Sequence, residues 1–142
     1  MQPMGAQRNL PQPGQLVRRP KVLLVDEDPR DRDRYREMLH DSGFDVSTSA
    51  DFTEAARLLE RESFDGIIVS QGGPDFKGRT VLEDSVARDR YRPVVVLSRY
   101  HDVGCYLEAM QLGAVDYLEK PLSAYEIVRA LTTHLRSNNA AA

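Results

Sequence analysis

The chain has 142 residues, enough for one domain with a proper core, and its 41% hydrophobic and 29% charged content is typical of a globular protein. No apolar run approaches the roughly 20 residues needed to span a bilayer, and no secretory signal precedes the body, which predicts a cytoplasmic protein with no membrane partner. Residues 1–21 carry +4, so the formal charge of −3 leaves −7 on residues 22–142 and argues against a nucleic-acid partner.

Residues 1–20 are predicted to be a disordered basic leader, because they hold four of the eight prolines and four glutamines. Residues 21–136 are predicted to form one domain, and residues 137–142 a frayed tail. The single Cys105 is expected to be a small buried apolar residue in a helix, in a reducing compartment.

The first half of the domain alternates strands and helices. Residues 21–25 predict a buried strand, and Pro29 to about Asp41 a helix with a thin apolar stripe and a solvated run of alternating Asp and Arg. Residues 44–48 alternate apolar and polar side chains, as in a half-exposed edge strand. Asp51 can cap the following helix, and residues 66–69 are short, β-branched and unbroken, which is typical of a strand buried on both faces.

The second half repeats the alternation. A helix is predicted over residues 79–89, a buried strand over 93–97, and a helix capped by Asp102 and closed by Gly113. A short strand over 116–119 leads to Lys120-Pro121. Ser123 and Glu126 then form a capping box ahead of a final stripe containing Ala124, Ile127, Val128, Leu131 and Leu135. Five strands alternating with five helices predict a three-layer, doubly wound α/β fold with a parallel five-stranded sheet.

Polar residues gather where the predicted strands end, the edge at which open α/β sheets carry their sites. Asp26 and Glu27 follow the first strand, and Ser70 follows the third, ahead of a loop that begins Gln71-Gly72-Gly73-Pro74. Ser98 ends the fourth strand, and Lys120 follows the fifth, three residues after Tyr117. His40, His101 and His134 are isolated and lack metal-ligand spacing.

Together these residues resemble the response-regulator receiver (CheY-like) family, over roughly Lys21 to Arg136. The resemblance implies the flavodoxin-like order of five strands and a Mg²⁺ site at Asp26 and Glu27, to which Gly72 would contribute. It also matches Ser98 to the family's hydroxyl, Lys120 to its lysine and Tyr117 to its rotating aromatic. The phosphoacceptor position falls on Ser70, where the family has aspartate.

A serine at this position removes the carboxylate nucleophile and one metal ligand. We therefore expect Ser70 to be inert, Mg²⁺ binding to be weak at best, and no other cofactor. The Lys120 ammonium is expected to pair with Asp26 or Glu27, because an unpaired charge in a crevice is costly. The alternative is that a separate kinase phosphorylates Ser70.

The predicted function is a stand-alone, non-enzymatic receiver-like module of a two-component or phosphorelay system, which acts by contact with a kinase or effector. The resemblance places the partner surface on the fourth helix, last strand and fifth helix, near Arg99, Tyr100, Tyr106 and Tyr117. Two alternatives remain open. One is a Mg²⁺-dependent phosphotransfer receiver that uses another acid, such as Asp28 or Asp75; the other is a homodimerising scaffold.

Overall fold

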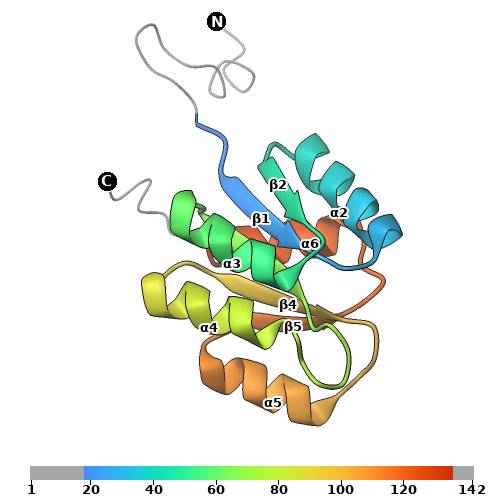
Figure 1. The fold of residues 1–142 in the computed structure, drawn as a ribbon. Helices are drawn as coiled ribbons and strands as arrows, with labels where there is room; N and C mark the ends of the chain where they lie inside the picture. The colour runs from blue at the N-terminus through green and yellow to red at the C-terminus, as the bar shows by residue number, and fades with distance from the viewer. Residues whose placement is uncertain (1–17, 136–142) are drawn as a thin grey trace, which may run out of the picture.

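Five parallel strands form the central layer of the computed structural model, which describes residues 18–135 (Figure 1). Their spatial order is β2-β1-β3-β4-β5, so the chain moves first to one edge of the sheet and then to the other. The predicted doubly wound parallel sheet is confirmed. The strands are β1 (Lys21–Val25), β2 (Asp45–Ser49), β3 (Gly66–Ser70), β4 (Val94–Ser98) and β5 (Asp116–Glu119).

Helices cover both faces of the sheet, and strand side chains alternate between the two resulting cores. Leu23, Ile67 and Val96 belong to the core beneath α3 (Phe52–Arg61), α4 (Arg79–Arg88) and α5 (Val103–Leu112). Leu24 and Ile68 belong to the core beneath α2 (Pro29–Asp41) and α6 (Ala124–Thr132). All residues of β3 and β4 are buried, as expected for strands covered on both sides.

The local signals placed most of the boundaries. The capping box of α6 is present, with the Ser123 hydroxyl accepting from Glu126 N–H at 3.1 Å. Cys105 is buried on α5 as expected, and burial raises the pKa of its thiol to about 11. Small differences remain: β2 and β4 begin one residue later than predicted, at Asp45 and Val94, α4 ends at Arg88 rather than residue 89, and Ala124 is exposed instead of belonging to the buried stripe of α6.

The described chain begins inside the segment predicted to be a leader. Arg18 donates two hydrogen bonds to the Asp65 carboxylate at 3.0 and 3.2 Å, and the Pro20 carbonyl accepts from Asp45 N–H at 2.9 Å. Residues 18–20 therefore contact the domain. The predictions for residues 1–17 and 137–142 lie outside the described residues. No helix between residues 18 and 135 is both long and apolar enough to cross a membrane.

Candidate functional site

The ends of four strands bring the predicted site residues to one edge of the sheet. Asp26 and Lys120 directly follow β1 and β5, while Ser70 and Ser98 end β3 and β4. The register places Ser70 beside Leu97, and Ser98 beside Glu119 of β5. All four side chains are buried. The parallel topology therefore brings residues up to 94 positions apart to one sheet edge, and a pocket between the start of α2 and Lys120, here called the crevice, opens there.

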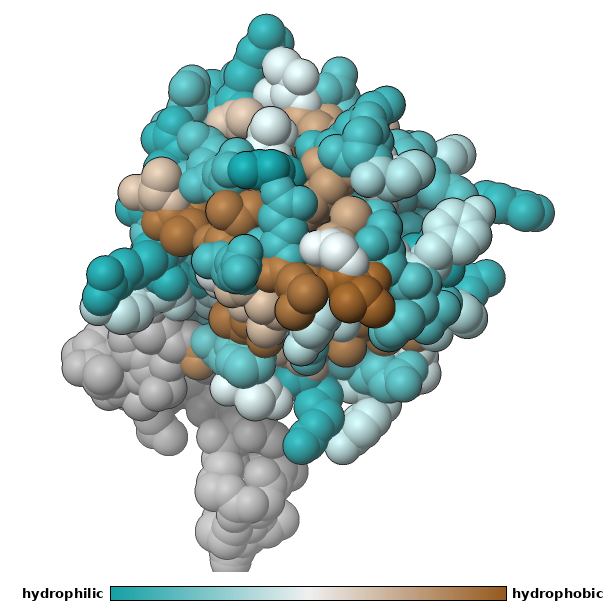
Figure 2. Space-filling model, turned by 90° about the horizontal axis from the view of Figure 1, so that it is seen from below, coloured by the Kyte–Doolittle hydropathy of each residue, from teal (hydrophilic) through white to brown (hydrophobic). Residues whose placement is uncertain are grey.

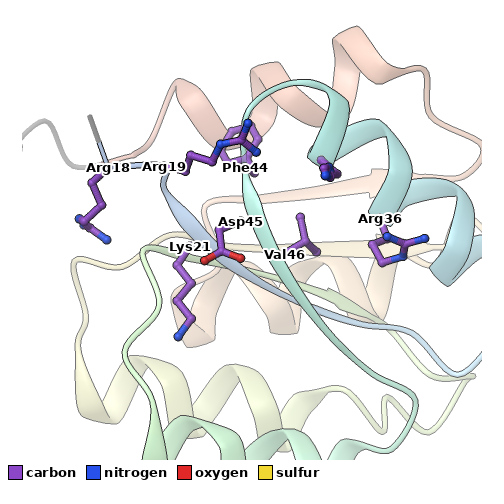
Figure 3. A pocket seen from close by; sticks show the side chains of 8 residues that line it. Arg18, Arg19, Lys21, Arg36, Phe44, Asp45 and Val46 are labelled. Carbon is purple, nitrogen blue, oxygen red and sulfur yellow. The ribbon is translucent and has the colours of Figure 1, made fainter. Parts of the chain in front are cut away.

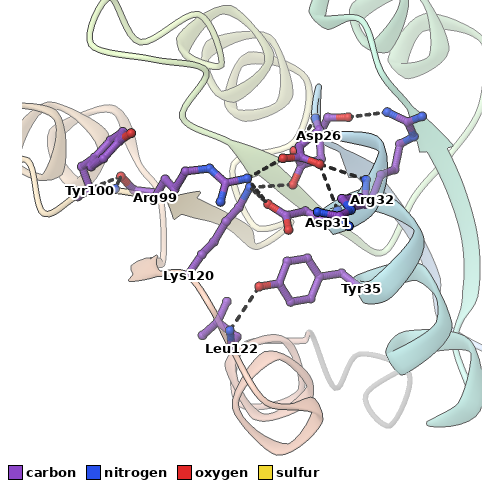
Figure 4. Close-up of polar contacts among 11 residues, drawn as sticks. Asp26, Asp31, Arg32, Tyr35, Arg99, Tyr100, Lys120 and Leu122 are labelled. Atoms are coloured by element: carbon purple, nitrogen blue, oxygen red, sulfur yellow. Dashed lines mark hydrogen bonds and ion pairs between the residues drawn. The ribbon is translucent and has the colours of Figure 1, made fainter.

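Five charged side chains form an ion cluster at the mouth of this crevice (Figure 4). Lys120 Nζ lies 2.8 Å from Asp26 Oδ2 and 2.9 Å from Asp31 Oδ2. Arg99 Nη2 lies 2.6 Å from the same Asp31 oxygen and 2.5 Å from Asp28 Oδ2. The cluster consequently ties the start of α2 to the β4–α5 and β5–α6 loops.

The ion pairs of the cluster differ in how far they are buried. The Lys120 and Asp26 side chains are 5% and 1% exposed, whereas Arg99 is 49% exposed. Burial lowers the pKa of the Lys120 ammonium, but hydrogen bonds to Asp26 and Asp31 outweigh it and hold that pKa above its ordinary value. Lys120 is therefore a protonated, charge-compensated lysine and not a free base.

The helix start supplies the other contacts of the ion cluster. Asp28 caps α2 by accepting from Arg30 and Asp31 N–H, and the hydrogen bond from Asp31 N–H is the main cause of its lowered pKa. The Asp26 carboxylate also accepts from Asp28 N–H at 3.0 Å. One turn further along, the Tyr35 hydroxyl accepts from Leu122 N–H at 3.1 Å and links α2 to the segment after Lys120.

The expected pairing of Lys120 is confirmed for Asp26 but not for Glu27, which is exposed. Sequence reasoning missed Asp31, and it placed Arg99 near the partner surface without predicting its ion pairs with Asp28 and Asp31. Asp31 was included in a charge run interpreted as solvated, although its side chain is 16% exposed. A usable signal was its spacing three residues after the helix cap Asp28, which puts it on the first turn facing the crevice.

Ser70 lies against a loop that closes tightly around it. Gly78 N–H donates to the Gln71 carbonyl at 2.9 Å, and a Cβ added at Gly78 would lie 2.1 Å from the Ser70 carbonyl oxygen. Gly72 has a φ of +80°, a conformation that favours glycine. Among the described residues, the Ser70 hydroxyl has no hydrogen bond to Lys120 or to any carboxylate.

Ser98 and Tyr117 each have partners of their own. The Ser98 hydroxyl donates to the Tyr100 carbonyl and accepts from Tyr100 N–H at 3.1 Å. The Tyr117 hydroxyl donates to Gln71 Oε1, and its ring meets Tyr106 edge-on with 5.7 Å between centroids. Burial is the main reason that the pKa of Tyr117 lies above its ordinary value. Ser98 is thus held by the β4–α5 loop, and Tyr117 by the β3–α4 loop and α5.

The donor set does not suit a tightly bound divalent cation. Asp26 already accepts from Lys120 and from a backbone N–H, and Ser70 offers an uncharged hydroxyl. Within residues 18–135, no group of three or more His, Cys, Asp or Glu is arranged to hold a metal. Mg²⁺ prefers charged oxygen ligands in near-octahedral geometry, and here Asp26 and Asp31 are paired with Lys120 and Arg99.

Residues 22–132 match the response regulator receiver domain, and the chain belongs to this family. It is 35% identical over 126 residues to the transcriptional regulatory protein PrrA of Mycobacterium leprae, covering 89% of this chain and 54% of PrrA. It is 31% identical to the alginate biosynthesis regulator AlgB of Pseudomonas aeruginosa, covering 82% of this chain and 28% of AlgB. The chain therefore spans from about a quarter to about half the length of these two relatives.

Solved structures show the same fold. A CheY-like receiver domain protein of Methanospirillum hungatei superposes with a TM-score of 0.79 at 20% identity, covering 88% of this chain and all of that one. The receiver domain of an HD domain-containing protein of Pseudomonas fluorescens gives 0.77 at 26% identity, covering 87% and 99%. The family and fold implied by the site residues are thereby confirmed.

Proposed function

We propose that this chain is a receiver-type signalling module that acts through protein contact without aspartyl phosphorylation. The observation that carries the proposal is Ser70, an uncharged side chain at the position where the resemblance places the phosphoacceptor. Phosphoryl transfer to a receiver needs a carboxylate nucleophile and a cation that offsets charge on the transferring group. Ser70 supplies no carboxylate, and Asp26, one of the two acids expected to hold the metal, is paired with Lys120 at 2.8 Å.

The contacts of the neighbouring acids also disfavour a substitute phosphoacceptor. Asp28 caps α2 and pairs with Arg99 at 2.5 Å, so a phosphoryl group on its carboxylate would cost both interactions. Asp75 is exposed on the β3–α4 loop and, within residues 18–135, has no contact that would position it as an acceptor. Ser70 itself has no base within hydrogen-bond reach among the described residues, which supports its being inert.

Phosphorylation assays with matched variants test the proposal. The wild-type chain, Ser70→Ala and Ser70→Asp would be incubated with acetyl phosphate and Mg²⁺, and intact mass would be followed. We expect no gain of about 80 Da, the mass of one phosphoryl group, in wild type or Ser70→Ala. A wild-type adduct lost on mild alkali would refute the proposal. If Ser70→Ala kept that adduct, another acid such as Asp28 or Asp75 would be the acceptor.

A cell extract containing Mg²⁺ and ATP tests the remaining alternative, modification of Ser70 by a serine kinase. We expect no acid-stable adduct on the wild-type chain. An adduct that survives acid and is absent from Ser70→Ala would place the switch on the Ser70 hydroxyl. It would overturn the claim that Ser70 is inert while leaving the fold assignment untouched.

The exposed face of α5 is the surface proposed for the partner. Tyr100 is 70% exposed, and Val103 and Leu107, one turn apart on α5, are 56% and 53% exposed. Figure 2 views the molecule from the side on which α5 lies in Figure 1, and hydrophobic side chains gather there. Aromatic and apolar side chains at the centre of a patch suit a protein interface.

Substitution on this face tests the partner surface. Leu107→Glu should abolish capture of a partner kinase or effector, because it places a charge in the apolar centre. Tyr91→Glu is a control, since Tyr91 is 64% exposed but lies outside α5 and β5. Equal losses in both variants, or none in Leu107→Glu, would remove α5 from the proposal.

A second copy of the chain is the other candidate occupant of the α5 face. One structural neighbour, the beryllofluoride-activated NtrC4 receiver domain, was solved as a dimer and superposes with a TM-score of 0.73 at 22% identity. Concentration-dependent light scattering of wild type and Leu107→Glu decides between the two occupants. A dimer lost in Leu107→Glu would make this chain a homodimerising scaffold.

A further inference from the structure

A basic pocket lies at the opposite end of the sheet from the crevice (Figure 3). Lys21 begins β1 and Asp45 begins β2, so the pocket borders the amino-terminal ends of these strands, whereas the ion cluster follows carboxyl-terminal ends. The remaining basic residues come from the segment before β1 and from α2. Its volume of about 640 Å³ falls in the range of small-molecule sites, about 300–1,000 Å³.

Positive charge is concentrated in this pocket although the whole chain carries −3. The basic lining residues are Arg18, Arg19, Lys21, Arg36 and His40, against one carboxylate, that of Asp45. Two of these cations are compensated locally: Arg18 pairs with Asp65 and Lys21 with Glu62, each at 3.0 Å. Arg19 and Arg36 have no ion pair with any residue between 18 and 135.

Some basic residues of the pocket have a structural role, but Arg19 and Arg36 have none that the structure shows. His40 stands in the last turn of α2, a position where basic residues are favoured. Arg19 approaches from the segment before β1 and the half-buried Arg36 from α2, with the start of β2 between them (Figure 3). Because neither guanidinium has a carboxylate partner among residues 18–135, both keep their N–H donors available for an anion.

The geometry points to a phosphate group as the ligand. Each guanidinium presents a planar fork of N–H donors that matches phosphate oxygens, and two forks suit a group with several such oxygens. Phe44 lines the pocket, but its side chain is 4% exposed, so it offers no ring face for stacking a nucleotide base. Recognition would therefore depend on charge and not on an aromatic ring.

We propose that this pocket binds a polyphosphate or phosphate-ester anion between Arg19 and Arg36, at a site separate from the receiver crevice. Arg18 and Lys21 add positive potential at the rim while retaining their acidic partners. The proposal is independent of Ser70, because none of the pocket residues belongs to the ion cluster.

Calorimetric titration of the full chain with sodium pyrophosphate at low salt tests the site. Wild type should bind saturably, and Arg19→Ala/Arg36→Ala should bind at least about tenfold more weakly. Arg57→Ala/Arg61→Ala is the matched control, because it removes two exposed α3 arginines and changes the net charge equally. Absence of saturable binding, or equal weakening in both double variants, would overturn the proposal.

Sedimentation with lipid vesicles distinguishes a soluble phosphate ligand from a lipid headgroup. The same variants would be sedimented with phosphatidylcholine vesicles that contain or lack phosphatidic acid. Loss of sedimentation in Arg19→Ala/Arg36→Ala alone would assign the site to a phosphate headgroup. Pyrophosphate binding without sedimentation would assign it to a soluble anion.

Discussion

The buried ion pair between Lys120 and Asp26 should dominate the response of this fold to mutation. Lys120→Met removes the ammonium and leaves the Asp26 carboxylate, 1% exposed, without its charge partner. Breaking a buried pair from one side costs about 3–5 kcal/mol, because the remaining charge stays desolvated. At roughly 4 °C per kcal/mol for a domain of this size, a loss of about 3 kcal/mol lowers Tm by roughly 12 °C.

The penalty should depend on pH with a definite sign. Burial already raises the pKa of Asp26 above its ordinary value, and loss of the lysine removes the hydrogen bond that opposes this. The folded variant then binds a proton more readily than the unfolded chain, so its stability falls as pH rises through the folded pKa. The difference from wild type should therefore be smaller at about pH 5 than at about pH 8.

Urea unfolding of four proteins measures the effect. Asp26→Asn/Lys120→Met should recover most of the loss, because it removes both charges while an amide oxygen can still accept from Asp28 N–H. Arg88→Met is the control, since its partners Asp84 and Glu60 are 33% and 63% exposed and each pair should contribute less than about 1 kcal/mol. A Lys120→Met loss no larger than that of the control would refute the reasoning.

Three further outcomes follow from the same structure. Arg99→Ala should cost less than about 1 kcal/mol in urea unfolding, and less still at high salt, because Arg99 is 49% exposed. Iodoacetamide should alkylate Cys105 about 100-fold more slowly at pH 8 in the folded than in the unfolded chain, because its pKa is raised to about 11; equal rates would contradict this. Gly78→Ala should destabilise by about 1–3 kcal/mol, since its Cβ would lie 2.1 Å from the Ser70 carbonyl oxygen. Gly104→Ala, whose Cβ would have no neighbour closer than 3.5 Å, should not destabilise in the same assay.

The parallel sheet and the edge that carries the site were predictable from strong local signals, whereas the strand order came from the family resemblance. The β-branched run ending at Ser70 can be buried on both faces only in a covered parallel sheet, and that sheet brings Asp26 and Lys120 together. The contacts of Asp31 and Arg99 were not predictable from composition. Alternating Asp and Arg on α2 resembles a solvated face, and only the direction of the first helical turn separates the half-buried Asp31 from its exposed neighbours.

Contacts at the start of the chain were missed for a related reason. Proline and glutamine content predicts disorder as an average over a segment. The contact of residues 18–20 depends instead on one backbone hydrogen bond from Asp45 and one side-chain pair with Asp65. Neither leaves a periodic pattern, and the partners are at least 25 positions away in sequence.

The residues at positions 70 and 31 both affect the net charge around Lys120. The Lys120 ammonium, 5% exposed, already has two carboxylate partners in Asp26 and Asp31. A carboxylate at position 70 would add a further negative charge to this edge of the sheet, where Glu27 and Asp28 also lie, and repulsion would raise the pKa of the buried acids. A serine hydroxyl can be buried there, 4% exposed, without adding charge. Ser70 therefore leaves the ion cluster with three carboxylates against two cations and adds no further charge to this edge of the sheet.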